Sequence, residues 1–195
     1  MAQPARPLRA DAARNRARVL EVACETFAAE GLSVPIEEIA RRSGVGTGTV
    51  CRHFPTKQDL VEAVFADRLR LIVDEGQALL DSGEPGQALF DFLRLLVLDW
   101  GATNHGLKKA FAGSEIKIKT EGAEDAFLAI LGELLRTAQE AGTARTDVGA
   151  AEVKGLIIGC QAMQTYNTGL AERLVDVVFD GLRAAPAEAR RPARP

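Results

Sequence analysis

The chain has 195 residues and a net charge of −3; 47% of its residues are hydrophobic, 26% are charged and 5% are aromatic. These proportions are typical of a globular protein whose core consists mainly of aliphatic side chains. No apolar run approaches the ~20 residues that a membrane-spanning helix needs, and the N-terminus lacks the apolar segment of a signal peptide.

The charge is unevenly distributed along the chain. Residues 1–57 contain nine Lys/Arg and six Asp/Glu, whereas the remainder contains fifteen and twenty-one. The first twenty residues alone contain five arginines and one aspartate. A basic N-terminal segment in an otherwise acidic protein can form a local patch that binds phosphates. A solvated N-terminal tail without a specific partner would have the same charge.

Three cysteines, Cys24, Cys51 and Cys160, are far apart and odd in number. No pair has the spacing of a zinc or redox motif, so we expect neither a disulfide framework nor a metal site. This pattern fits a reducing cytoplasm.

The spacing of apolar residues is helical and predicts an all-α fold. Gly31 ends the first expected helix, Pro35 opens the second, and Thr56 caps the fourth. The segment 115–119 alternates like a strand, but it has no partner strand and is interpreted as a helix end or loop. The expected helices cover about 13–30, 35–44, 47–53, 57–80, 86–102, 105–119, 123–141, 148–167 and 170–184, with a linker at 81–86.

The segment from Ile36 to Pro55 has the layout of a helix-turn-helix, in which two short helices are joined by a turn that contains Gly44. Ile39 and Ala40 are expected to face inward from the first helix. Val45 fills the turn, and the second helix is anchored by Val50 and Phe54. The remaining residues of the second helix face outward, where a helix-turn-helix enters the major groove of DNA. An ordinary helical hairpin is the alternative interpretation.

This segment and its flanks, from Arg14 to Val64, resemble the N-terminal DNA-binding domain of the TetR family of transcriptional regulators. The resemblance rests on Phe27 to Gly31, Ile39-Ala40, Gly44-Val45, Gly48-Thr49, His53-Phe54 and Lys57 to Leu60. It implies a three-helix DNA-binding domain at 13–58, preceded by a flexible basic arm at 1–12. A helical domain for effector binding and dimerisation would follow at 59–184, with a disordered tail at 185–195.

The resemblance also implies roles for individual residues. Thr49 would contact a phosphate or a base, and Lys57 would meet a phosphate at the start of the fourth helix. Thr47 and Arg52 occupy variable positions facing the groove and are candidates for sequence selection. The expected DNA-binding residues are Thr47, Gly48, Thr49, Cys51, Arg52, His53 and Lys57.

Cys51 departs from the family pattern, which usually has a tyrosine there whose hydroxyl meets a phosphate. A cysteine side chain is shorter than tyrosine, and its thiol is a weak donor. Either some affinity for DNA is lost at this position, or the Arg-rich N-terminal arm supplies it. The arginines of this arm are Arg6, Arg9, Arg14, Arg16 and Arg18. A redox-sensing role for Cys51 is an alternative.

The C-terminal helices offer two further sets of candidates. Large or polar side chains suited to an apolar effector pocket are Trp100, Asn104, His105, Phe111, Phe127, Met163 and Tyr166, each of which is alternatively ordinary core. The resemblance implies a four-helix dimer interface formed by the last two helices, where the candidates are Leu156, Gly159, Met163, Leu174, Val177 and Val178.

We therefore expect a TetR-like repressor that binds operator DNA as a homodimer and is released by an unknown small molecule, with no cofactor. No catalytic Ser/His/Asp order, phosphate loop or carboxylate pair indicates an enzyme. A helical interaction module with weakened DNA binding is the other alternative, and Cys51 favours it.

Overall fold

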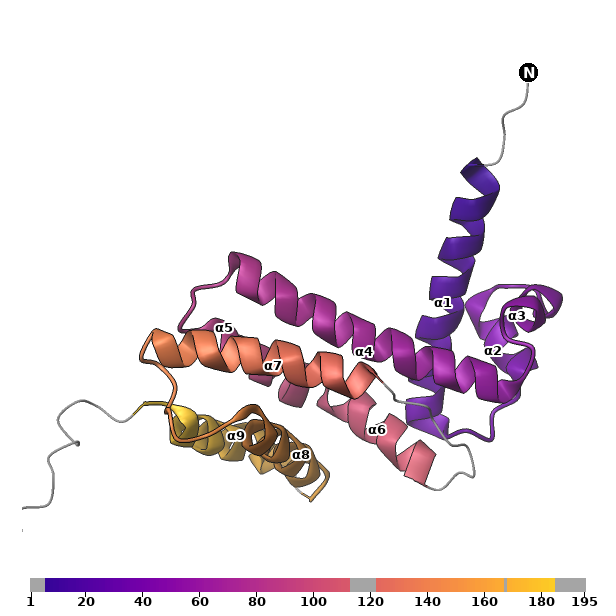
Figure 1. The fold of residues 1–195 in the computed structure, drawn as a ribbon. Coiled ribbons are helices and arrows are strands. Elements are labelled where there is room, and N and C mark those ends of the chain that lie inside the picture. Colours follow the sequence, from indigo (N-terminus) through magenta and orange to yellow (C-terminus); the bar gives the residue numbers. More distant parts are fainter. Residues whose placement is uncertain (1–5, 113–121, 167, 185–195) are drawn as a thin grey trace, which may run out of the picture. The chain divides into compact units, whose positions relative to one another are not determined.

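A computed structural model describes residues 6–112, 122–166 and 168–184, except for the side chains of residues 6–9, 102, 104, 105, 108, 111, 112, 123, 164–166 and 168–171. All regular elements in these ranges are helical, which confirms the all-α prediction. The chain folds into two compact units (Figure 1). The first contains residues 1–70 and 103–120, and the second contains residues 71–102 and 121–195. No helix in the described ranges is both long and apolar enough to span a bilayer.

The first unit begins with α1 (Arg6–Glu30), α2 (Ile36–Ser43) and α3 (Thr47–His53). Helix α1 ends at Gly31, whose φ of 82° is a left-handed conformation that favours glycine. Helix α2 starts directly after Pro35, whose carbonyl accepts hydrogen bonds from Glu38 and Ile39. Glu37 and Glu38 lie in its first turn and Arg41 and Arg42 in its last, so both ends complement the helix dipole.

Helix α1 begins earlier than its sequence predicts. Residues 6–12, part of the expected flexible arm, form the first turns of α1 rather than an extended segment. Ala10, Ala12 and Ala13 favour this extension because alanine has the highest helix propensity. Residues 1–5 of the expected arm lie outside the described residues.

The core of the first unit extends beyond the three helices of the predicted DNA-binding domain. Val19, Leu20, Ala23 and Phe27 of α1 pack with inward-facing residues of α2 and α3. The start of α4 (Lys57–Ser82) and one residue of α6 (Gly101–Ala112) complete this core with Leu60, Val61, Val64 and Leu107. The compact unit therefore passes the expected boundary at residue 58, because α4 and α6 supply part of its apolar interior.

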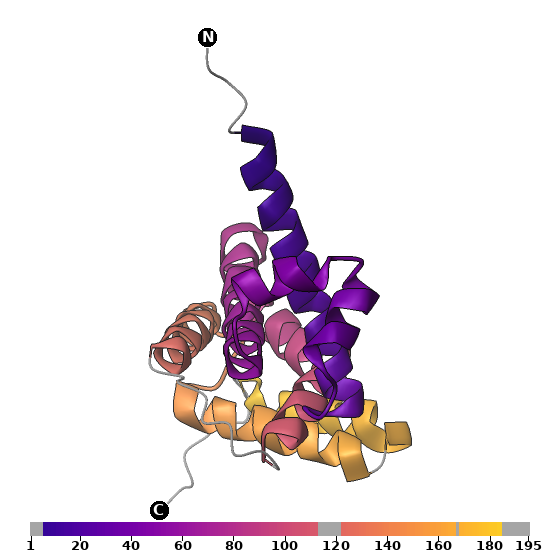
Figure 2. The same ribbon diagram turned by 90° about the vertical axis from the view of Figure 1, so that its right-hand side faces the viewer.

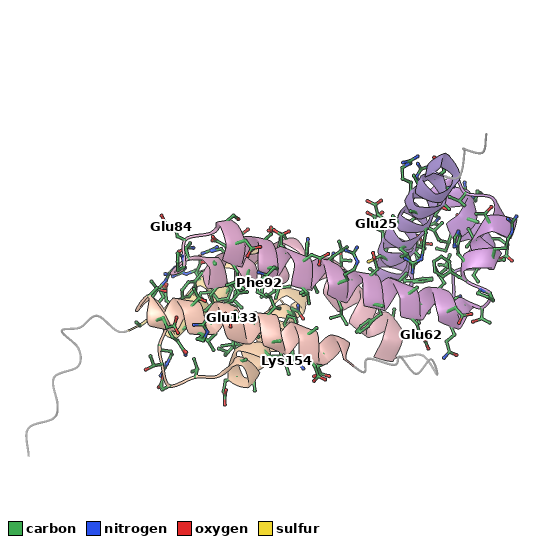
Figure 3. The ribbon with its side chains drawn as sticks, turned by 45° about the horizontal axis from the view of Figure 1, so that its top comes forward. Glu25, Glu62, Glu84, Phe92, Glu133 and Lys154 are labelled. Atoms are coloured by element: carbon green, nitrogen blue, oxygen red, sulfur yellow. The ribbon has the colours of Figure 1, made fainter. Side chains whose placement is uncertain are left out.

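The second unit is a helical bundle. Its core joins α5 (Ala88–Arg94), the turn η1 (Leu95–Asp99), α7 (Ala123–Glu140), α8 (Ala150–Tyr166) and α9 (Thr168–Leu182). Phe92 points inward from α5 and is fully buried, whereas Glu133 lies on the exposed face of α7 (Figure 3). Helices α8 and α9 lie side by side (Figure 2).

The single helix expected at 86–102 is interrupted. Helix α5 passes into a π-helical turn at Leu95–Asp99, and α6 begins at Gly101 after a break at Trp100. The sequence prediction was wrong here because a π turn has nearly the same apolar spacing as an α-helix. The alternating segment 115–119 and the expected disordered tail at 185–195 lie outside the described residues.

The loop between α7 and α8 is tied to the end of α9. The Arg145 N–H donates to the Leu182 carbonyl at 2.9 Å, and the Ala184 N–H donates to the Thr143 carbonyl at 2.9 Å. Gln139 Nε2 donates to the carbonyls of Arg145 and Val148 at 2.9 and 3.0 Å. These bonds satisfy backbone groups of the loop and, at Leu182, a carbonyl that the end of α9 leaves without an intrahelical partner.

Candidate nucleic-acid interface

The turn between α2 and α3 is held by backbone hydrogen bonds. Gly44 has φ 66° and ψ 22°, and its N–H donates to the carbonyls of Ala40 and Arg41. Val45 donates its N–H to the Ala40 carbonyl at 3.1 Å and is 8% exposed. A glycine in the left-handed region followed by a buried valine turns the chain sharply and anchors it, as the sequence predicts.

Helix α3 divides into one buried position and a broad outer surface. Val50 is fully buried, and Phe54, just after the helix, is 3% exposed. Ile39 and Ala40 of α2 are buried against the same core, which confirms the predicted inward face. The side of α3 that faces away from the core contains the exposed residues Thr47, Gly48, Cys51, Arg52 and His53 and the half-buried Thr49.

Gly48 has no role in the packing of the chain itself. A Cβ added there would have no heavy atom within 4 Å, and its φ is not positive. Glycine inside a helix costs about 1 kcal/mol relative to alanine. The packing of the chain itself therefore does not require glycine at this position.

An ion-pair network lies on α2. Hydrogen bonds from Arg41 and Arg42, with N–O distances of 2.7 Å, hold the pKa of Glu38 at about 2. Arg42 also pairs with Glu30 at the end of α1, and its pKa is raised by Glu30 and Glu38. These two arginines are therefore partly neutralised by carboxylates of their own chain.

Arg52 differs from the arginines of α2. It takes part in no ion pair within the part of the chain that the structure describes, and it is exposed at the end of α3. Arg16 of α1 lies nearby, with its guanidinium carbon 5.6 Å from the centre of the Phe54 ring. The His53 ring lies 6.2 Å from the same ring, centre to centre. Phe54 thus links Arg16 of α1 to the end of α3.

The other arginines of α1 differ in their surroundings. Arg14 pairs with Asp11, and Arg18 is exposed. The side chains of Arg6 and Arg9 lie outside the described residues. The sequence pointed to a set of basic residues but not to the contact between Arg16 and Phe54, because no spacing rule connects positions 38 residues apart.

Lys57 makes a contact that the sequence did not indicate. Its Nζ donates to the Val34 carbonyl at 2.7 Å, and burial lowers the pKa of its ammonium group. The bond ties the start of α4 to the loop before α2. An ammonium group has three donors, so two others are left for a further acceptor such as a phosphate.

A reciprocal cap fixes the start of α4. The Thr56 N–H donates to Asp59 Oδ2 at 2.9 Å, and the Asp59 N–H donates to Thr56 Oγ1 at 3.1 Å. This is a capping box in which aspartate replaces the usual glutamate. It confirms Thr56 as the cap of α4.

Cys51 is exposed on the outer side of α3, Cys24 is half-buried and Cys160 is buried. All three are free thiols, and burial raises the pKa of Cys24 and Cys160. Within the described ranges, His, Cys, Asp and Glu side chains form no group of three suited to a metal ion.

Three of the expected effector-pocket residues lie at the hydrophobic core of the second unit. Trp100, Phe127 and Met163 are partly buried and pack against the core of the second unit. The side chains of Asn104, His105, Phe111 and Tyr166 lie outside the described residues. Sequence analysis missed Gln161, which is 5% exposed and whose Nε2 donates to the Leu96 carbonyl at 3.4 Å. Its neighbours in sequence resemble an ordinary buried helix face, so no pattern singled it out.

The expected dimer residues fall into two groups. Exposed apolar side chains on α8 and α9 are Leu156 at 37%, Leu174 at 37% and Val177 at 63%, with exposed Gly159 among them. Ile158 is a further member, 49% exposed, that the sequence analysis did not include. Met163 and Val178 instead pack partly against the core of the second unit.

Two short helices joined by a tight turn, with an outer side of small, polar and basic residues, define a helix-turn-helix DNA-binding protein. Residues 19–64 match the model of bacterial regulatory proteins of the tetR family, and residues 84–184 match the C-terminal domain of SbtR-like transcriptional regulators. The chain belongs to the TetR family of transcriptional regulators.

Solved structures resemble the chain over most of its length. The TetR transcription regulatory protein from Mycobacterium vanbaalenii is 56% identical, with a TM-score of 0.78, over 91% of this chain and 100% of that one. The TetR regulator SCO0520 from Streptomyces coelicolor is 29% identical, with a TM-score of 0.74, over 88% and 99%. The regulator SrpR from Pseudomonas putida is 40% identical over 65 residues, which are 33% of this chain and 30% of that protein. The chain thus spans less than a third of that curated relative.

Proposed function

We propose that the protein is a transcriptional repressor that binds operator DNA as a homodimer and is released by a small-molecule effector. The observation that supports DNA binding most directly is the outer side of α3. All its residues except Val50 are exposed or half-buried, and Gly48 leaves open space where another molecule can approach the backbone. Family membership supports the same function.

Selection of binding sites from random-sequence duplexes tests DNA binding directly. The DNA that flanks the protein's own gene is a second test substrate. We expect a two-fold symmetric site whose half-sites lie about one helical turn apart, because each subunit presents one recognition helix. Equal binding to all duplexes across a salt series would contradict the proposal and favour an interaction module with weakened DNA binding.

Variants of Arg52 distinguish base recognition from phosphate contact. If Arg52 contacts a guanine, Arg52→Ala relaxes specificity at one position and costs about 1–3 kcal/mol. If it contacts a phosphate, affinity falls on all sequences and the salt slope decreases by about 0.9. Arg136→Ala is the control, because Arg136 is an exposed arginine in the second unit. Unchanged binding by Arg52→Ala together with Lys57→Ala would refute the placement of the interface.

Dimerisation is supported by the apolar side chains left exposed on two adjacent helices. Leu156, Ile158, Leu174 and Val177 lie on α8 and α9, and exposed glycines at 155 and 159 permit close approach of another helix. Val177→Glu should therefore leave the chain folded but monomeric in analytical ultracentrifugation. Leu71→Glu is the control, since Leu71 is also 40% exposed but lies on α4. A dimeric Val177→Glu protein would contradict this interface.

Release by an effector is supported by the continuity of α4, whose first half belongs to the first unit and whose second half belongs to the second. A ligand bound near Trp100, Phe127 and Met163 would shift α4 and change the separation of the two recognition helices. A coupling of about 1–3 kcal/mol corresponds to a 5- to 150-fold loss of operator affinity. Compounds found by thermal-shift screening test this proposal, which fails if all of them leave operator affinity unchanged.

Cys51 supplies a test of the two alternatives. If its thiol merely weakens a phosphate contact, Cys51→Tyr should tighten operator binding on all sequences. Loss of binding after peroxide treatment, absent in Cys51→Ser, would instead establish redox sensing.

A further inference from the structure

The outward side of α9 has an apolar centre at Val177. Its side chain is 63% exposed, more than any other large apolar side chain in the described part of the chain. Leu174, three residues earlier, is 37% exposed, and a Cβ added at Gly181, four residues later, would enter open space. Because one residue turns a helix by about 100°, Leu174 and Gly181 lie on the same side of Val177, about 60° and 40° away.

Two charged residues lie on the other side of Val177. Arg173 and Asp180 are about 40° and 60° from it around the helix, about one turn before it and one turn after it. Both side chains are exposed. Arg173 takes part in no ion pair within the described ranges, and Asp180 lies 3.6 Å from Arg183. Helix α9 therefore presents an apolar centre with a positive and a negative group along one edge.

A second copy of α9 is complementary to this surface when the two helices lie antiparallel. A two-fold axis beside Val177 places each residue that precedes Val177 opposite one that follows it in the partner. Arg173 then lies near the partner's Asp180, and Leu174 lies over the open space at the partner's Gly181. A parallel pair of helices would instead place both charged residues opposite the apolar side of the partner, which is unfavourable.

We propose that two copies of the chain recognise each other through reciprocal ion pairs between Arg173 and the partner's Asp180, across an antiparallel pair of α9 helices. The ion pairs lie at the edge of the apolar contact, so they contribute selectivity for an identical copy more than affinity. This inference rests on the homodimer of the proposed function, which the apolar residues alone would also allow.

Charge reversal at either position tests the pairing. In an Arg173→Asp dimer two carboxylates oppose each other at both contacts, and in an Asp180→Arg dimer two guanidinium groups do. We expect each variant to dimerise at least about tenfold more weakly than the wild type in sedimentation, because attraction becomes repulsion at two places. An equimolar mixture of the two variants should form a heterodimer about as stable as the wild-type dimer, because each contact then joins an acid and a base.

A chain that carries both reversals provides a second, independent variant. Arg173→Asp combined with Asp180→Arg restores an acid and a base at each contact of its own dimer. It should therefore dimerise like the wild type, yet exchange no subunits with it, because a mixed dimer would join like charges at both contacts. If either single variant does not fold, this double variant decides alone. A double variant that exchanges freely with the wild type overturns the proposal.

Glu172→Arg is the matched control. Glu172 is exposed and adjacent to Arg173, but it lies about 140° from Val177 around the helix and so does not face the partner. Its reversal makes the same charge change as Asp180→Arg and should leave dimerisation unchanged. Equal weakening by Glu172→Arg, or Arg173→Asp and Asp180→Arg dimers as tight as the wild type, overturns the proposal.

The same measurements separate this inference from the homodimer itself. If Val177→Glu dissociates the wild-type dimer but both charge reversals leave it intact, the dimer forms through α9 without these ion pairs, and only the further inference fails. If the wild-type protein is monomeric at every concentration, the homodimer and its ion pairs fail together.

Discussion

Replacement of Gly106 by alanine tests whether α6 is packed against α1 as closely as the structure shows. The added Cβ would lie 2.4 Å from the Ala28 carbonyl oxygen, 2.9 Å from its carbon and 3.0 Å from the Ala28 Cα. All three atoms belong to the backbone, so no side-chain rotation relieves the contact. Ordinary contacts begin at 3.4 Å, and the two helices must therefore separate by about 1 Å.

Two opposing terms determine the magnitude. Overpacking of a well-packed site costs about 1–3 kcal/mol, and the upper half of this range applies when backbone has to move. Alanine in place of glycine in a helix returns about 1 kcal/mol. The net expectation is a loss of about 1–2 kcal/mol in the free energy of unfolding.

Gly132→Ala is the matched control. Gly132 lies inside α7, and an added Cβ there would meet only the Ala150 Cβ at 3.9 Å. This variant should gain about 1 kcal/mol, so the two variants differ by about 2–3 kcal/mol. Thermal unfolding by circular dichroism would show a difference of about 4–12 °C. Equal midpoints would refute the close packing of α6 on α1.

Three further predictions concern the cap, the ion pairs and the dimer. Thr56→Ala should lower the free energy of unfolding by about 1 kcal/mol in urea denaturation, because the Asp59 N–H loses its acceptor; unchanged stability would mean that the capping box is not formed in solution. The pKa of Glu38 is about 2 in the folded protein against 4.5 for the free side chain, so its stabilising pairs are complete above pH 4.5 and are lost as the pH falls toward 2. Glu38→Gln should therefore flatten the loss of stability between pH 5 and about pH 2 in denaturation curves, and a slope equal to that of the wild type would contradict the assignment. Gly159→Ala should stabilise each chain by up to about 1 kcal/mol, because its Cβ has open space, and yet weaken dimerisation in sedimentation; a tighter dimer would show that α8 does not approach its partner closely at Gly159.

Local features of the DNA-binding unit were predictable from the sequence because short-range chemistry determines them. Gly44 and Val45 form the expected turn, and Val50 and Phe54 anchor α3 as their spacing indicates. The cap at Thr56 and the stop at Gly31 depend on residues within a few positions. The outer side of α3 follows from the same periodicity.

Contacts between distant segments were not predictable. The bond from Lys57 to Val34, the stacking of Arg16 on Phe54 and the packing of Gly106 on Ala28 depend on tertiary geometry rather than spacing. The π turn escaped prediction because a shift of one residue barely changes the apolar pattern of 86–102. Its partner Gln161 lies on α8, more than sixty residues further along the chain.

Helix α3 separates the requirements of folding from those of recognition. Of the seven residues of α3, only Val50 is buried in the core. A Cβ added at Gly48 would enter open space. Substitutions on the outer side should therefore change the preferred DNA sequence with little loss of stability. Such a helix can acquire new operator specificities by single mutations, and a library randomised at Thr47, Gly48 and Arg52 would remain largely folded.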